Sequence, residues 1–100
     1  MLKLTTLQTV TREFDFIIYE AMDSDKLLQV AKSTNKDLIK DVLIYDVYKG
    51  NKIPIDKKSI AIKVFIHPIH ETLTDTDLEK ISSDLIAVVN KKLSGTLRDE

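Results

Sequence analysis

The run KKSIAIKVFIH, residues 57–67, restricts the fold more than any other feature because two kinds of residue alternate along it. Successive side chains of a strand point to opposite sides of a sheet. The run therefore predicts a long strand whose apolar face contacts a core. That face holds Ile60, Ile62, Val64 and Ile66, and the opposite face holds Ser59, Ala61, Lys63 and Phe65.

Three further strands are predicted. Residues 12–19 alternate with Phe14, Phe16 and Ile18 on one side, which is typical of a half-buried strand. Residues 41–50 form a second strand, for which simple alternation places Leu43, Tyr45 and Val47 toward the core. Residues 51–56 then form the turn of an antiparallel hairpin with the 57–67 strand, and residues 96–98 form a short last strand.

Two helices separate these strands. The first begins after Asp23 or Ser24, either of which can cap it, and places Leu27, Leu28 and Ala31 on one face. The second begins at Thr74, where Asp77 completes a variant capping box and Leu73 and Leu78 stand at hydrophobic-staple positions. Gly95 suits its end. Its apolar stripe comprises Leu78, Ile81, Leu85, Val88, Val89 and Leu93.

The predicted order is βαββαβ, so we expect an α+β, ferredoxin-like sandwich: a four-stranded antiparallel sheet with both helices on one face. The hundred residues are enough for one domain, spanning residues 1–100. The other sheet face is left uncovered. It is expected to carry Asp46, Tyr48, Ser59, Ala61 and Lys63.

The composition indicates the class of protein and the cellular compartment. The chain is 43% hydrophobic and 31% charged, which is typical of a folded domain, and it lacks cysteine, which excludes disulfides and thiolate metal sites. No apolar run approaches the roughly 20 residues that span a membrane, and we expect a cytoplasmic protein. The net charge of −1 does not favour binding of nucleic acid by field alone, and no DNA partner is expected.

The pair Asp46 and Tyr48 on the uncovered face allows two interpretations. Scattered polar groups on an open sheet are one; a surface on which an unpaired RNA base stacks is the other. A carboxylate repels phosphate but accepts hydrogen bonds from a base edge that presents N–H groups, as guanine does. The lysines around the hairpin turn, Lys49, Lys52, Lys57 and Lys58, either remain solvated or contact phosphates.

Catalytic and metal sites find little support. In HPIHE, His67 and His70 are separated by a segment containing Pro68, and no third metal ligand is obvious. No serine stands in a nucleophile-elbow context, and there is no glycine-rich phosphate loop. We therefore expect no catalytic residue, no metal site and no cofactor in this chain.

Several ordered motifs resemble one family. They are Arg12-Glu13, YDVYKG (45–50), PIDKKSIA (54–61), ETLTDTDL (71–78) and the final Leu97-Arg98. Together they are similar to the ferredoxin-fold anticodon-binding domain at the C-terminus of the bacterial phenylalanyl-tRNA synthetase beta subunit, from about residue 7 to residue 98. Tyr45, Lys49, Asp56 and Glu71 stand where the family has Phe, Arg, Gly and Arg, and Tyr45 would need a hydroxyl partner in a core position.

The resemblance implies the site and the partners. Tyr48 would stack on an anticodon base, Asp46 and Ser59 would bond to its edge, and Ala61 would also belong to the anticodon-binding residues. The partners implied are the tRNA(Phe) anticodon stem-loop, the rest of the beta subunit, and the alpha subunit of an α2β2 tetramer, with no membrane. The parent synthetase would use ATP and Mg²⁺ at an active site elsewhere.

Two alternatives remain open. Regulatory domains of the ACT kind share the βαββαβ order and bind amino acids, although they usually have glycine after the first strand, where EAMDSDK has none. A purely structural domain that braces a larger protein is the other. Titration with an anticodon stem-loop and with free amino acids would separate them.

Overall fold

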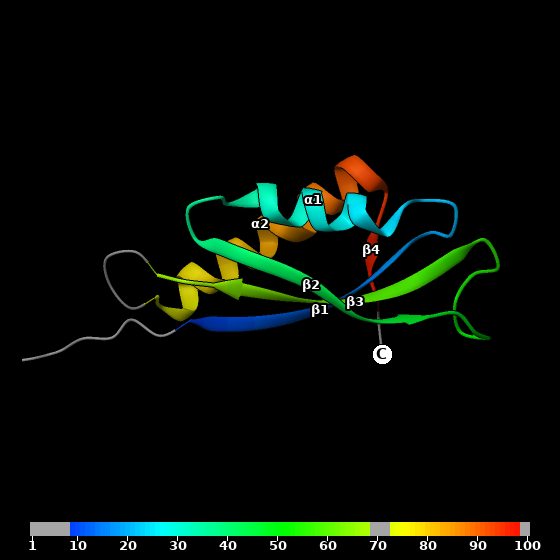
Figure 1. Ribbon diagram of the computed structural model, residues 1–100, viewed down its shortest axis with the longest axis horizontal. Coiled ribbons are helices and arrows are strands. Elements are labelled where there is room, and N and C mark those ends of the chain that lie inside the picture. Colours follow the sequence, from blue (N-terminus) through cyan, green and yellow to red (C-terminus); the bar gives the residue numbers. More distant parts are fainter. Residues whose placement is uncertain (1–8, 69–72, 99–100) are drawn as a thin grey trace, which may run out of the picture.

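The computed structural model describes residues 9–68 and 73–98, and in it two helices cover one face of a four-stranded antiparallel sheet (Figure 1). The strands lie in the order β2-β3-β1-β4. The predicted ferredoxin-like arrangement is therefore confirmed. The elements are β1 (Val10–Tyr19), α1 (Ser24–Thr34), β2 (Ile39–Tyr48), β3 (Lys57–Ile66), α2 (Asp75–Leu93) and β4 (Thr96–Leu97).

The core lies between the helices and the two central strands. Phe16 of β1 and Ile62 of β3 are fully buried, as are Leu27 of α1 and Leu85 of α2. Burying each such side chain contributes about 1.5–3 kcal/mol relative to leaving it exposed. The predicted core faces of the first and third strands are confirmed, because Ile18, Ile60, Val64 and Ile66 are also buried.

Capping interactions at both ends determine where α2 begins and where it ends. Thr74 Oγ1 accepts from the Asp77 N–H at 3.1 Å and Asp77 Oδ2 accepts from the Thr74 N–H at 3.0 Å, so the predicted capping box is confirmed. At the other end Ser94, not Gly95, takes the left-handed conformation, with φ 54°. Gly95 is required for a different reason: a Cβ there would lie 2.7 Å from Val89 Cγ1 and 3.0 Å from Ile18 Cγ2.

Strand β2 departs from the predicted alternation. Val42 and Ile44 pair with the core residues Val64 and Ile62, whereas Leu43 pairs with Lys63 and is 39% exposed. The register then shifts between Ile44 and Asp46, which is a β-bulge at Tyr45. The predictions that Leu43 and Tyr45 face the core are therefore wrong. Val47 does pair with Ile60, but it is 51% exposed on this edge strand.

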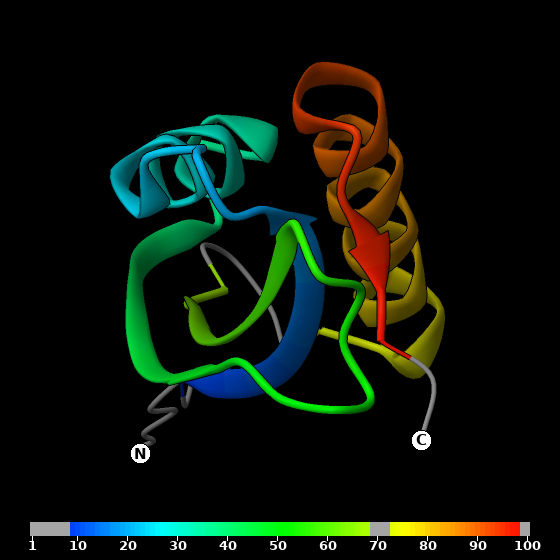
Figure 2. The ribbon, with the colours of Figure 1, turned by 90° about the vertical axis from the view of Figure 1, so that its right-hand side faces the viewer.

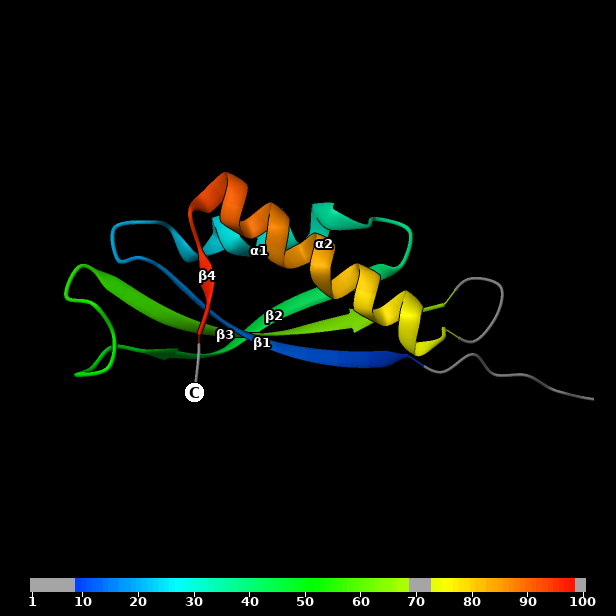
Figure 3. The same cartoon turned by 180° about the vertical axis from the view of Figure 1, so that it is seen from behind.

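The sheet is strongly curved. Figure 2 shows the end of β2 running toward the side of the molecule where β4 lies, although these two strands are opposite edges of the sheet. The view from behind shows α2 crossing the sheet diagonally, with β4 returning from its end to the edge of β1 (Figure 3). There β4 pairs with β1 through Phe16–Leu97 and Ile17–Thr96. This curvature makes the face away from the helices concave rather than flat.

Candidate functional site

The sheet face turned away from the helices, here called the open face, carries rows of side chains across β2, β3 and β1. Paired residues share a face, so the register defines these rows. Tyr48, Ser59 and Ile17 form one row. The next rows are Asp46, Ala61 and Asp15, and then Leu43, Lys63 and Glu13.

The structure brings Asp46 and Tyr48 together on the open face. Val42 and Ile44 face the core, and the bulge at Tyr45 shifts the alternation by one residue after them. Asp46 and Tyr48 therefore pair with Ala61 and Ser59 and point away from the core. Tyr48 is 41% exposed and Asp46 is also exposed. The predicted outward orientation of these two residues is therefore confirmed. An aromatic ring and an acceptor-only carboxylate lie on the same face of one strand, two residues apart.

Ser59 and Ala61 lie in the same rows but are less accessible than the sequence indicated. Ser59 is 3% exposed and Ala61 is 8% exposed. They belong to β3, which lies between β2 and β1 in a concave face. The neighbouring side chains of the flanking strands β2 and β1 therefore cover them. Ala61 forms a small floor between the carboxylates of Asp46 and Asp15 rather than an exposed contact.

Tyr45 has a hydroxyl partner, but on the open face instead of in the core. Its hydroxyl donates to Glu13 Oε1 at 2.9 Å. Lys63 lies beside both groups, with Nζ 5.7 Å from the Tyr45 ring centroid and 4.0 Å from Glu13 Oε2. The hydrogen bond to Glu13, with burial and the nearby carboxylates Glu13, Asp15 and Asp46, raises the pKa of Tyr45. Ionisation of this tyrosine is disfavoured in such an acidic surrounding.

The four lysines of the hairpin region have different environments. Lys49 pairs with Glu20, and Lys58 donates to the carbonyl oxygen of Met22 at 2.8 Å on the helical side. The Nζ atom of Lys57 lies 4.9 Å from the ring centroid of Tyr19 on β1. Lys52 is exposed in the connection between β2 and β3. The structure thus does not gather all four into one phosphate-binding cluster.

A hollow of about 380 Å³ adjoins the open face at the edge of β1. Glu13, Asp15 and Tyr45 lie there beside Leu97 and Arg98. The hollow is an open depression of the surface, and two carboxylates and one guanidinium are among its lining groups. It is lined by Glu13, Phe14, Asp15, Tyr45, Leu97 and Arg98.

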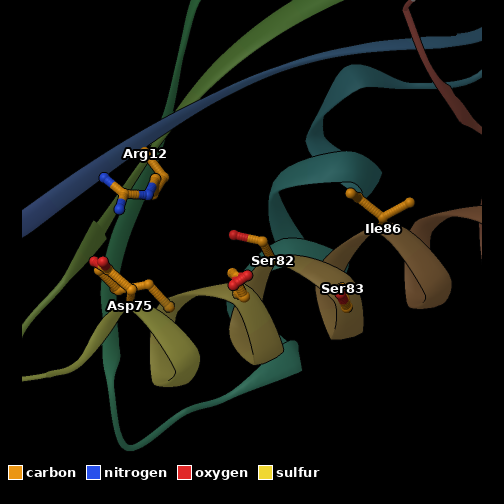
Figure 4. A pocket seen from close by; sticks show the side chains of 7 residues that line it. Arg12, Asp75, Ser82, Ser83 and Ile86 are labelled. Atoms are coloured by element: carbon orange, nitrogen blue, oxygen red, sulfur yellow. The ribbon is translucent and has the colours of Figure 1, made fainter.

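A second hollow, of about 480 Å³, lies on the helical side between β1 and α2 (Figure 4). Arg12 projects from β1 toward the first turn of α2, where Asp75 stands, and Ser82, Ser83 and Ile86 continue the wall. Neither Asp46 nor Tyr48 lines it. This hollow is therefore separate from the open face.

Of the two histidines considered as metal ligands, the described residues include His67. His67 Nδ1 lies 2.9 Å from Thr9 Oγ1, whereas His70 falls outside the described residues. Among residues 9–68 and 73–98 there is no group of three His, Cys, Asp or Glu side chains that could hold a metal ion. In the same part of the chain, no helix is long and apolar enough to cross a membrane.

Sequence reasoning missed several residues of the open face. Arg98 lies with its guanidinium carbon 5.2 Å from the Tyr48 ring centroid, and Glu13, Asp15 and Tyr45 border the same face. Glu13 and Asp15 alternate with the core residues of β1, so the alternation that identified the core already placed them outward. Arg98 had no such signal beyond its place in the final Leu-Arg motif.

Known proteins match nearly the whole chain. The sequence profile of the ferredoxin-fold anticodon binding domain family matches residues 5–98. The phenylalanine–tRNA ligase beta subunit of Paramagnetospirillum magneticum is 38% identical over 98 residues, and that of Bradyrhizobium diazoefficiens is 40% identical over 98 residues. Each alignment covers 98% of this chain but 12% of the relative.

Proposed function

The chain belongs to the family of ferredoxin-fold anticodon-binding domains, and from this premise we propose that its open face reads the anticodon of tRNA(Phe). The observation that carries the proposal is the placement of Asp46 and Tyr48 side by side on a concave sheet face. Single-stranded RNA bases are commonly bound by stacking on aromatic side chains and by hydrogen bonds to their pairing edges. This face offers both kinds of group.

Guanine at the first anticodon position fits Asp46 best. Its pairing edge presents the N1–H and N2–H donors, and an ionised carboxylate offers only acceptors. Adenine presents an acceptor where guanine presents N1–H, so it would meet repulsion as well as a lost bond. Tyr48 would stack on the base, and this contribution depends little on which base is present. In this proposal Ser59 and Ala61 shape the floor beneath the base. Because Ser59 is 3% exposed, its hydroxyl would bond to the base edge only once the base displaces the side chains that cover it.

The four hairpin lysines would not contribute equally to phosphate contacts, although the sequence suggested the same role for all of them. Lys52 and Lys57 are the better candidates for phosphate contacts. Lys49 and Lys58 already bind Glu20 and the Met22 carbonyl and would have to exchange these partners for a phosphate. Such contacts add affinity without sequence information.

The wider assembly follows from the relatives. We propose that residues 1–100 form one domain of a phenylalanine–tRNA ligase beta subunit, since the chain spans 12% of the beta subunits that it matches. Its other partners would then be the rest of that subunit and an alpha subunit in an α2β2 tetramer. The ligase would use ATP and Mg²⁺ at an active site outside this domain, in the cytoplasm.

Substitution of Asp46 tests the proposal. The chain is titrated with two anticodon stem-loops that carry guanine or adenine at the first anticodon position, and dissociation constants are measured by NMR. We expect the wild type to prefer guanine by about 1–3 kcal/mol, the contribution of one good base-edge contact. In Asp46→Ala this preference should shrink toward zero, with affinity lost only for guanine.

The matched control is Asp37→Ala, which removes an exposed carboxylate from the connection between α1 and β2. It should keep the wild-type preference. If Asp46→Ala also kept it, Asp46 would not read the base. Chemical-shift changes restricted to the helices would instead support a domain that only braces a larger protein, and shifts with free amino acids would support a regulatory role.

A further inference from the structure

The Tyr48 ring is contacted by the last described residue of the chain. The guanidinium carbon of Arg98 lies 5.2 Å from the ring centroid, although Tyr48 ends β2 and Arg98 follows β4 at the opposite edge of the sheet. The backbone N–H of Arg98 donates to the carbonyl oxygen of Asp15 at 2.7 Å, which anchors it beside β1. The curvature seen in Figure 2 is what lets these two edges meet.

Gly50 confines the other end of the ring. A Cβ at this position would lie 2.2 Å from the Tyr48 hydroxyl oxygen and 2.5 Å from Cζ, far inside van der Waals contact. Gly50 does not have a positive φ, so what the position requires is space rather than a special backbone conformation. The ring is thus held between the Arg98 side chain and the backbone of Gly50.

We propose that Arg98 is a positioning residue for base binding, which acts by covering one face of Tyr48 so that a single nucleobase stacks on the other face. This inference rests on the proposed function. A guanidinium is planar and stacks well on aromatic rings. A ring already fixed by Arg98 and Gly50 loses little side-chain freedom when a base binds, and this preorganisation raises affinity. The Arg98 guanidinium, the Tyr48 ring and the base would then form one stack in that order.

Two other roles for Arg98 must be distinguished from this one. A guanidinium can bind a phosphate directly, in which case its contribution would not depend on Tyr48. It can also occupy the ring face that a base needs, in which case its removal would tighten binding. A double-mutant cycle separates all three, because it measures whether the effect of one residue depends on the other.

The cycle comprises the wild-type chain, Tyr48→Ala, Arg98→Ala and the double variant, each titrated by NMR with the guanine-containing anticodon stem-loop. We expect Tyr48→Ala to weaken binding about 5- to 150-fold, as loss of one base–aromatic stack does. Arg98→Ala should weaken it about 2- to 5-fold, in line with an exposed cation–aromatic contact. The double variant should bind no more weakly than Tyr48→Ala.

An equal loss from Arg98→Ala in both backgrounds would overturn the proposal in favour of a phosphate contact, and tighter binding would overturn it in favour of competition. No effect of Tyr48→Ala would instead refute the proposed stacking itself. The control is Arg12→Ala, which removes the same charge from the helical side and should leave affinity unchanged.

Gly50→Ala provides a second test that does not change charge. The new methyl group should displace the Tyr48 ring, since a side-chain end moves more easily than backbone. We expect binding to fall toward that of Tyr48→Ala, while the amide signals of β1 and β3 stay in place. In the free protein, the ring-current shift of the Arg98 side-chain protons should disappear. An unchanged affinity together with a displaced ring would show that ring placement does not matter for binding.

Discussion

At the scale of single residues, Tyr45 shows how a side chain expected in the core is accommodated outside it. Its ring crosses the open face to Glu13 and lies near the Lys63 ammonium. The hydroxyl is a donor in this contact, so the contact depends on the neutral form of the tyrosine. The hydrogen bond to Glu13 is the largest cause of its raised pKa, followed by burial and the neighbouring carboxylates.

This raised pKa gives a prediction for stability at alkaline pH. An unfolded tyrosine ionises near pH 10, whereas folded Tyr45 holds its proton to higher pH. Its contribution is therefore complete below about pH 10 and is lost as the pH rises through the folded pKa. In Tyr45→Phe, the free energy of unfolding from urea melts should fall less steeply as the pH rises above about 10 than in the wild type.

Glu13→Ala is the control, because it keeps Tyr45 and removes the main cause of the shift. Absorbance titration should show the pKa of Tyr45 returning toward its ordinary value, and the alkaline fall in stability should again be shallower. Identical pH slopes in the wild type and Tyr45→Phe would contradict the hydrogen bond to Glu13.

At the scale of elements, what the sequence could predict depends on how unambiguous each pattern is. From residue 59 to residue 66 of β3, only one of the two alternate sets is apolar throughout, so its faces could be assigned. In β2 the residues from Val42 to Tyr45 are all apolar or aromatic, so over this range either alternation yields an apolar face. The pattern of apolar residues therefore gives no sign of the bulge. The contact between Arg98 and Tyr48 was equally unpredictable, because it arises from curvature of the whole sheet.

The neighbouring residues Leu43 and Ile44 test the bulge directly. Ile44 packs against the core and pairs with Ile62, whereas Leu43 is 39% exposed and pairs with Lys63. Truncating a buried Ile to Ala typically costs about 2–5 kcal/mol. We expect Ile44→Ala to lower the free energy of unfolding by at least about 1 kcal/mol more than Leu43→Ala in urea melts. The reverse order would mean that β2 alternates without interruption.

At the scale of the whole molecule, the fold separates the hydrophobic core from the face that we propose for base recognition. The helices and one sheet face form the core, and the curved opposite face carries the aromatic and acidic groups. The net charge is −1, and carboxylates of Glu13, Asp15 and Asp46 lie on the open face itself. Such a surface attracts RNA weakly at long range. In the proposed function, selectivity would therefore come from short-range contacts with a base, and most phosphate contacts would be supplied by the rest of the proposed synthetase.

This charge distribution predicts weak binding of an anticodon stem-loop by the chain alone, with a shallow salt dependence. Each phosphate contact to a single strand steepens the slope of log affinity against log salt concentration by about 0.7. If Lys52 and Lys57 make the main contacts, the slope between about 50 and 200 mM salt should be near −1.4. Lys52→Ala should reduce it by about half, whereas Lys91→Ala in the last turn of α2 should leave it unchanged. A slope steeper than about −3 would require Lys49 and Lys58 to leave their partners within the domain and bind phosphate as well.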